Sequence, residues 1–186
     1  MDHDTRLLER VKRWDEEALA EVFDRYAPAI YRYVYRHVGD GQTAQDLMAE
    51  TFQRLLDALR RGAGPRAHLS AWLYRVAHNL VVDHYRRQPA DPVVALDLVE
   101  PAGGALEESV LMERERAARV RAALRQLTPL QQQVILLRYL EGMSLEDVAQ
   151  VLERTVGSVK ALQYRAIRSL QRLLEDAGVG VEEVNS

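Results

Sequence analysis

The chain contains no cysteine among its 186 residues, which excludes disulfide bridges and thiolate zinc sites. No apolar run approaches the ~20 residues of a membrane-spanning helix. The first residues, MDHDTRLLERVKRW, carry charges where a secretory signal would have its apolar core. We therefore expect a cytoplasmic protein. The sequence also lacks a glycine-rich phosphate loop, a nucleophile motif and an internal repeat.

Lysine is scarce as well, since only Lys12 and Lys160 are lysines among the 25 cationic residues. The formal net charge of −3 conceals a strong segregation of charge. Residues 60–87 contain six arginines and one acid, whereas residues 91–115 contain seven acids and one arginine. Because nucleic acid binds to local basic patches, the acidic total does not exclude a nucleic-acid-binding protein.

Apolar residues recur at helical spacing along most of the chain, and no segment alternates as a strand would. Prolines and adjacent glycines between residues 88 and 106 are typical of a linker. The sequence thus predicts an all-α fold with two small helical domains. The expected helices cover 16–26, 29–37, 43–61, 70–87 and 107–127, and a further one begins at Pro129. The expected divisions are an extension 1–15, a domain 16–88, an acidic linker 89–106, a domain 107–176 and a tail 177–186.

Capping patterns indicate where several helices begin. Thr43 is expected to cap one helix with Asp46 as its capping-box partner, and Thr128-Pro129-Leu130-Gln131 combines a cap, a first-turn proline and a closing glutamine. Ser144 and Thr155 precede two further apolar-periodic segments. Each of these patterns predicts a helix start.

Residues 144–174 are typical of a helix-turn-helix, because two capped helices are separated by a short turn. The second helix places apolar residues on one face. Its other face carries Lys160, Tyr164, Arg165 and Arg168. Such a basic helix fits the major groove of DNA, and a merely solvated arginine face is the alternative.

The expected helix 43–61 has two faces. Its buried face contains Met48, Phe52, Leu55, Leu56 and Leu59. The opposite face carries an acidic stripe at spacings of four, three and four: Asp46, Glu50, Gln53 and Asp57. This stripe is either a docking surface for a basic partner helix or a solvated surface.

The expected helix 70–87 interleaves aromatic rings with arginines. We expect Trp72, Leu73, Val76, Leu80 and His84 on its inner side. The other side carries Arg75, Asn79, Asp83 and Arg86. Single-stranded nucleic acid requires both rings for stacking and cations along its phosphates, although aromatic residues here also suit a domain core.

Three segments together resemble one family. They are DLMAETFQRL at 46–55, AWLYRVAHNLVVDHYRR at 71–87 and SLEDVAQVLERTVGSVKALQYRA at 144–166. In this order, with a proline-rich linker between them, they resemble the extracytoplasmic-function (ECF) group of bacterial RNA polymerase sigma factors. The resemblance identifies residues 16–88 with sigma region 2 and residues 107–176 with region 4. It implies a protein without catalytic chemistry or cofactor.

The resemblance also implies partners and contact residues. Core RNA polymerase would bind through its β′ clamp coiled coil and its β flap, and the docking segment matches at Asp46, Glu50, Phe52 and Gln53. Minus-ten DNA would meet Arg66, His68, Arg75, His78, Asn79, Asp83 and Arg86. Minus-35 DNA would meet Arg154, Thr155, Ser158, Lys160, Ala161, Tyr164, Arg165 and Arg168. An anti-sigma protein would control activity. Ala161 and His78 depart from the family's usual serine and arginine.

Three further hypotheses concern the role of the linker and two alternative functions. The acidic residues of 91–108 would mimic a nucleic-acid strand in the channels of polymerase, or belong to a solvated linker. A helix-turn-helix regulator that works without polymerase is an alternative function, although it would not need residues 43–87. A metal enzyme built on His78, Asp83 and His84 is disfavoured, because their spacing on a helix is poor for ligation.

Overall fold

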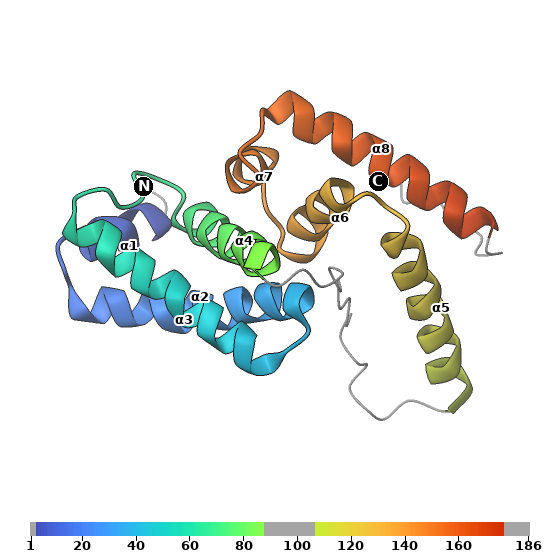
Figure 1. The fold of residues 1–186 in the computed structure, drawn as a ribbon, viewed down its shortest axis with the longest axis horizontal. Helices are drawn as coiled ribbons and strands as arrows, with labels where there is room; N and C mark the ends of the chain where they lie inside the picture. The colour runs from blue at the N-terminus through green and yellow to red at the C-terminus, as the bar shows by residue number, and fades with distance from the viewer. Residues whose placement is uncertain (1–2, 88–106, 177–186) are drawn as a thin grey trace. The chain divides into compact units, whose positions relative to one another are not determined.

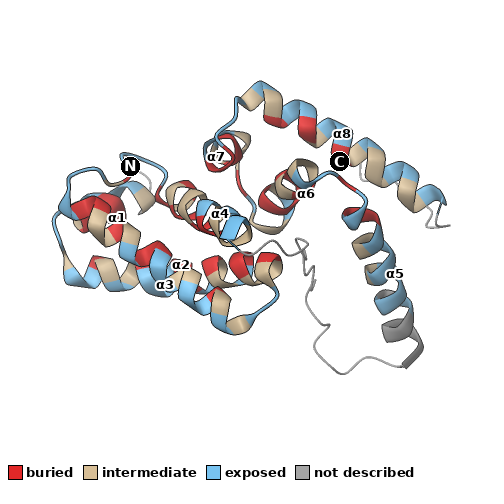
Figure 2. Ribbon diagram, in the orientation of Figure 1, coloured by how far each residue is buried: buried red, intermediate tan, exposed pale blue. Residues whose placement is uncertain are grey.

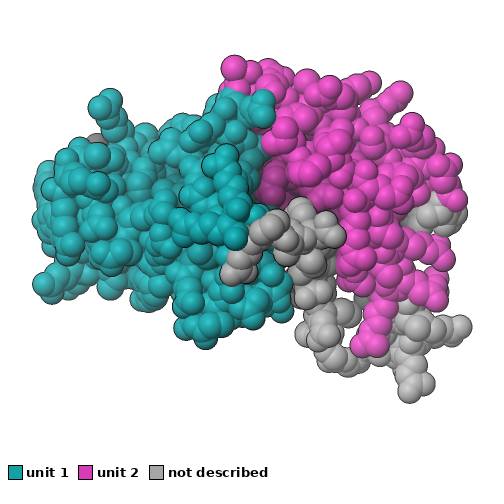
Figure 3. All heavy atoms as spheres, in the orientation of Figure 1, with its two compact units in different colours: residues 1–95, 146–154 teal, residues 96–145, 155–186 magenta. Residues whose placement is uncertain are grey.

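The computed structural model describes residues 3–87 and 107–176, and these residues form helices and turns without strands (Figure 1). The all-α prediction is confirmed for this part of the chain. The chain divides into two compact units, residues 1–95 with 146–154 and residues 96–145 with 155–186 (Figure 3). The acidic linker hypothesis falls on residues that lie largely outside the described ranges.

Within residues 3–87 of the first unit, four helices share one apolar core (Figure 2). Helix α2 packs against α1, α3 and α4, and α3 packs against α4. Their bounds are α1 His3–Lys12, α2 Glu16–Val38, α3 Gly41–Arg60 and α4 Leu69–Arg87. Sequence analysis assigned no helix to residues 1–15, yet Leu7, Leu8 and Val11 of α1 are buried. Helix α1 is therefore part of the core.

Helix α2 is continuous where two separate helices, 16–26 and 29–37, were expected. Pro28 lies inside it, where it removes one backbone hydrogen bond and costs about 3 kcal/mol. Tyr26, Ala27 and Ile30 are buried on both sides of the proline, so their burial offsets that cost. The helix begins after Asp15, whose side chain accepts from Ala18 N at 3.1 Å, and ends at Gly39 with φ +70°.

Helix α3 begins earlier than expected. Asp40 is its cap, and its Oδ2 accepts from Thr43 N at 2.7 Å. The prediction that Thr43 caps this helix was therefore wrong, because a better-placed carboxylate three residues upstream accepts the free N–H. Phe52, Leu55 and Leu59 are buried as expected. Met48 and Leu56 are only half-buried.

Helix α4 turns a slightly different face inward than expected. Its buried residues include Leu73 and Leu80 but also Ala71, Tyr74 and Ala77. Trp72, Val76 and His84, which were expected on the inner side, are half-buried. Tyr74 accounts for the difference, since its ring packs edge-on against Tyr33 of α2 with ring centres 5.2 Å apart.

The second unit contains α5 Glu107–Arg125, α6 Pro129–Ile135, a π-helical turn at Leu136–Leu140 and α8 Val156–Asp176. Helix α8 packs against α6 and α5. The capping box before α6 is confirmed: Thr128 Oγ1 accepts from Gln131 N at 3.4 Å, and Gln131 Oε1 accepts from Thr128 N at 3.0 Å. The expected helix from Pro129 thus continues as a π-turn before Gly142, which has φ +66°.

Helix α7, Leu145–Val151, precedes α8 in the chain. Ser144 directly precedes its first residue, as the capping pattern predicted. After α7 the chain reverses at Glu153, which has φ +52°, and Arg154 N donates to Ala149 O at 2.9 Å. The order of helix, turn and helix expected from residues 144–174 is therefore present in the chain.

Candidate polymerase and nucleic-acid interfaces

The acidic stripe formed by Asp46, Glu50, Gln53 and Asp57, here called the α3 stripe, lies on the solvent side of α3. Asp46, Glu50 and Gln53 are exposed. Glu50 Oε1 accepts from Arg54 Nη2 at 2.7 Å and from Arg54 Nε at 3.1 Å, one turn along the same helix. Asp57 is half-buried and accepts from Gln53 Nε2 at 3.4 Å. The stripe therefore presents carboxylates that a basic partner surface can reach.

Phe52 does not share this surface, although the family's docking segment includes it. Its side chain is 8% exposed, and its ring meets Phe23 of α2 edge-on with ring centres 4.9 Å apart. Phe52 therefore supports the exposed residues from inside. Direct contact of Phe52 with a partner stays a prediction.

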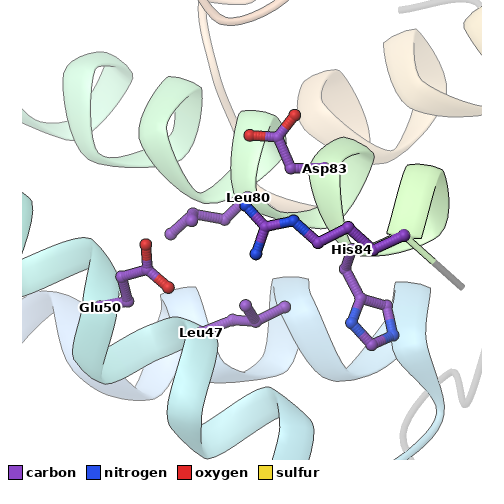
Figure 4. A pocket seen from close by; sticks show the side chains of 6 residues that line it. Leu47, Glu50, Leu80, Asp83 and His84 are labelled. Carbon is purple, nitrogen blue, oxygen red and sulfur yellow. The ribbon is translucent and has the colours of Figure 1, made fainter.

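A hollow between α3 and α4 adjoins the stripe. Figure 4 shows Glu50 and Leu47 projecting from α3, and Leu80, Asp83 and His84 from α4, around it. Arg87 also lines this hollow. Glu50, predicted to bind polymerase, and Asp83, predicted to bind DNA, thus line the same hollow.

The residues expected at minus-ten DNA fall on α4 and on the loop before it. Asn79 and Arg86 are exposed, and Arg75 and Asp83 are half-buried. Asp83 Oδ1 lies 3.9 Å from Arg86 Nη1. Helix α4 thus carries hydrogen-bonding groups and cations along one exposed side.

The loop before α4 carries two more of the predicted minus-ten residues, Arg66 and His68, and both are exposed. His68 has φ +52°, a left-handed backbone that is uncommon for a non-glycine residue. Loop residues 63–68 line a hollow together with Ala71, Trp72 and Arg75 of α4. A half-buried indole and a guanidinium beside a loop are groups on which an unstacked base can be received.

His78 differs from the other predicted minus-ten residues because it points inward. Its Nδ1 lies 3.0 Å from the Tyr33 hydroxyl. Burial, with a smaller repulsion from His37, lowers the pKa of His78 to about 4. The ring is therefore uncharged near neutral pH and offers no cation to a phosphate. Sequence analysis missed Tyr33, because 45 residues separate the partners and no local pattern links them.

Helix α8 has an apolar buried face and a basic exposed face, as expected. Val159, Leu162 and Ala166 are buried, and Thr155 Oγ1 accepts from Ser158 N at 3.2 Å, which confirms the predicted cap. Ser158 is half-buried. The other predicted minus-35 residues are exposed: Arg154, Thr155, Lys160, Ala161, Tyr164, Arg165 and Arg168.

The exposed side chains of α8 interact with one another along the helix. Arg165 Nε donates to Ala161 O at 3.3 Å, and the Arg168 guanidinium lies 6.0 Å from the centre of the Tyr164 ring. Tyr164 is 65% exposed. An exposed ring between cations offers both charge for phosphates and a planar surface for bases.

Within residues 3–87 and 107–176, no three histidine, aspartate or glutamate side chains form a group that could hold a metal ion. In the same ranges, no helix combines the length and apolar character that a membrane span needs.

Family models match two separate segments of the chain. The family model described as Sigma-70 region 2 matches residues 22–90, and that described as Sigma-70, region 4 matches residues 117–170. The chain is 38% identical over 174 residues to the ECF RNA polymerase sigma factor BldN of Streptomyces coelicolor, covering 91% of this chain and 65% of that protein. It is 33% identical over 184 residues to the RNA polymerase sigma-H factor of Pseudomonas aeruginosa, covering 94% and 95%.

Solved structures share the fold. The structure of CnrH in complex with the cytosolic domain of CnrY matches with a TM-score of 0.65 at 23% identity, covering 94% of this chain and 99% of that one. The sigma factor RpoE of Bartonella quintana, solved with the anti-sigma factor NepR, matches with a TM-score of 0.63 at 21% identity, covering 88% and 98%.

These matches define a two-part transcription-initiation factor rather than an enzyme. The chain belongs to the sigma-70 family, and within it to the ECF group of RNA polymerase sigma factors. The resemblance drawn from three sequence segments is thereby confirmed. A helix-turn-helix regulator that works without polymerase is not favoured, because the region 2 match covers most of α2 and all of α3 and α4.

Proposed function

We propose that this protein binds core RNA polymerase, directs it to promoters with minus-ten and minus-35 elements, and helps to open the DNA. The main support for the proposal is a pair of exposed surfaces in a chain that matches sigma regions 2 and 4. They are the acidic stripe on α3 and a basic, aromatic face on α8. The first surface suits a protein partner with basic side chains, and the second suits duplex DNA. The protein would act in the cytoplasm, where polymerase works.

Core polymerase would dock on the α3 stripe. Asp46, Glu50 and Gln53 are exposed and would face basic side chains of the β′ clamp coiled coil. Phe52 would hold α3 in place through its packing against Phe23. The region 4 unit would meet the β flap.

Helix α4 and the preceding loop would bind the minus-ten strand. Asn79 and Asp83 supply hydrogen-bonding groups, and Arg75 and Arg86 supply charge. Flipping a base out of the duplex costs a few kcal/mol. Stacking returns about 1–3 kcal/mol for each base, so the hollow beside Trp72 suits the flipped base.

Helix α8 would enter the major groove at the minus-35 element. Lys160, Arg165 and Arg168 would bind phosphates and base edges, and Ala161 and Tyr164 would make apolar contacts there. Arg154, Thr155 and Ser158 surround the start of the helix, where backbone N–H groups favour phosphate.

Activity would be controlled by an anti-sigma protein that covers the polymerase and DNA surfaces. CnrH is structurally similar and was solved with the cytosolic domain of CnrY, and RpoE was solved with the anti-sigma factor NepR. These assemblies belong to those proteins and support the proposal by analogy of fold.

Run-off transcription tests the proposed function. Purified core polymerase is mixed with the full chain and a library of templates with randomised promoter sequence, and transcript 5′ ends are sequenced. We expect new start sites that share two conserved elements upstream. Arg165→Ala should relax selection in the upstream element only, whereas Arg116→Ala, which removes an exposed arginine from α5, should leave both elements unchanged. Start sites identical to those of core polymerase alone would refute the proposal.

A further inference from the structure

The buried surface between α2 and α4 contains a specific polar contact. His78 Nδ1 of α4 lies 3.0 Å from the hydroxyl oxygen of Tyr33 of α2. Tyr33 is 1% exposed, and its ring packs edge-on against Tyr74 of α4, with ring centres 5.2 Å apart. A buried hydroxyl needs a hydrogen-bond partner, and His78 is one. The two helices therefore meet in one preferred register at this point.

A second contact holds α4 two turns further along. The hydroxyl of Tyr85 donates to the carbonyl oxygen of His37 on α2. His37 Nδ1 donates in turn to the carbonyl oxygen of Tyr33 at 2.6 Å, and the rings of His37 and Tyr33 have centres 4.5 Å apart. Helix α4 is thus joined to α2 at His78 and at Tyr85 through one connected group.

These contacts determine how α4 is rotated about its own axis. Hydrogen bonds are directional, whereas the apolar packing of Ala71 and Ala77 around them is not. Asn79 directly follows His78 and is exposed. A rotation of α4 that separates His78 from Tyr33 would turn Asn79 through the same angle, so the inner contact and the outer surface are coupled.

We propose that His78 is a positioning residue for minus-ten recognition: its hydrogen bond with Tyr33 holds α4 so that Asn79 and Arg75 meet the DNA strand, and His78 itself does not touch DNA. This inference rests on the proposed function of α4. Burial keeps the pKa of His78 at about 4, so the ring is neutral in the working range and is suited to an internal hydrogen bond.

The test uses the full chain assembled with core polymerase on two templates, a parent promoter and one with a single changed minus-ten base. The readout is the ratio of transcript from the two templates. Because both templates meet the same enzyme, this ratio does not depend on how much of the protein is folded. The variants are Tyr33→Phe, His78→Leu and their combination, with Tyr31→Phe as a control that removes a different hydroxyl from α2.

We expect Tyr33→Phe and His78→Leu each to lower the ratio about fivefold, the equivalent of one lost hydrogen bond. The double variant should lower it no further than either single variant, since both remove the same contact. His78→Asn should keep most of the ratio, because its side-chain oxygen can occupy the place of Nδ1. Tyr31→Phe should match the parent protein.

Two results would overturn the inference. If His78→Leu lowers the ratio while Tyr33→Phe leaves it unchanged, His78 contacts DNA directly. If Tyr33→Phe behaves like Tyr31→Phe in every comparison, the hydrogen bond does not position α4. This comparison of the two tyrosine variants remains decisive even when His78→Leu is unstable. If the wild-type protein starts no transcripts, the proposed function itself is refuted. In that case the Tyr31→Phe control is inactive as well.

Discussion

At the scale of single residues, exposure separates the predicted contact residues into two groups. Glu50 and Arg165 are exposed and form hydrogen bonds within their own helices, to Arg54 and to the Ala161 carbonyl. Such bonds cost little to break or share when a partner arrives. Phe52 and His78 instead face other helices. We propose that His78 affects promoter recognition through the placement of its exposed neighbours, and direct contact of Phe52 with a partner stays a prediction.

Reversing the charge of Glu50 should weaken binding to core polymerase. Glu50→Lys places a cation in the α3 stripe, where we propose that a basic surface docks, so we expect affinity to fall about tenfold. Fluorescence titration of labelled protein with core polymerase measures this. Asp24→Lys makes the same charge change on an exposed part of α2 and should leave affinity unchanged. Equal losses in both variants would show that net charge, and not the stripe, sets the affinity.

His78 should make the first unit less stable as the pH falls. Its pKa is lowered from 6.5 to about 4, so between these values the unfolded chain binds a proton that the folded chain does not. The stabilisation is present above pH 6.5 and is lost progressively toward pH 4. Urea unfolding of wild type and His78→Asn across this range should show a smaller slope with pH in the variant. Parallel curves would contradict the inward placement of His78.

The carboxylates Asp15 and Asp40 should not interfere with that comparison. The Arg10 guanidinium and the Ala18 N–H lower the pKa of Asp15, and the Thr43 N–H lowers that of Asp40. Their stabilisation is present above their ordinary pKa of 3.8 and is lost as the pH falls through that value toward their lowered pKa. Wild type and His78→Asn share both carboxylates, so this loss is common to the two curves and does not change their difference.

At the scale of helices, caps determine where several elements begin. Thr128→Ala should lower the stability of the second unit by about 1 kcal/mol, because Gln131 N loses its acceptor. Thr128→Ser keeps the hydroxyl and should retain most of that stability. Chemical denaturation followed by circular dichroism measures both. A Thr128→Ala midpoint equal to that of wild type would mean that the capping box contributes nothing.

Sequence reasoning located helices best where all partners are close in the chain. The Thr128 capping box lies within four residues, and its pattern predicted the contacts correctly. Pro28 misled the prediction for α2, because the burial of Tyr26 and Ile30 against other helices outweighs a local rule. The cap of α3 was assigned to Thr43 because Asp46 three residues later completes a capping-box pattern, yet Asp40 caps the helix. Tyr33 and His78 could not be paired from the sequence at all.

The exposed residues of the candidate site were also predictable, because their positions depend only on the geometry of their own helices. Helical spacing placed Asp46, Glu50 and Gln53 on one face and the basic residues of α8 on another, and the structure leaves them exposed. Periodicity gives the direction of a side chain relative to its own helix. It does not give the neighbouring helix, which is why Trp72 was expected on the inner side of α4. For the same reason the contact of His78 with Tyr33 was not foreseen, and only the family resemblance placed His78 at DNA.

At the scale of the whole molecule, the proposed polymerase-binding and minus-35-binding surfaces lie on different compact units. The first carries the α3 stripe and α4, and the second carries α8. Each unit has its own buried residues, among them Ile30 and Leu73 in the first and Val134 and Val159 in the second. Because each unit has its own core, each can bind a different part of the polymerase–promoter complex. Promoter selection would therefore require both units to bind the same polymerase.

The most direct test of this account is co-purification followed by start-site mapping on one selected promoter. Core polymerase and the full chain are combined, the complex is isolated, and the 5′ end of its transcript is determined. We predict a stable complex that starts RNA at a position that core polymerase alone does not use. A chain that core polymerase neither retains nor redirects would contradict the account.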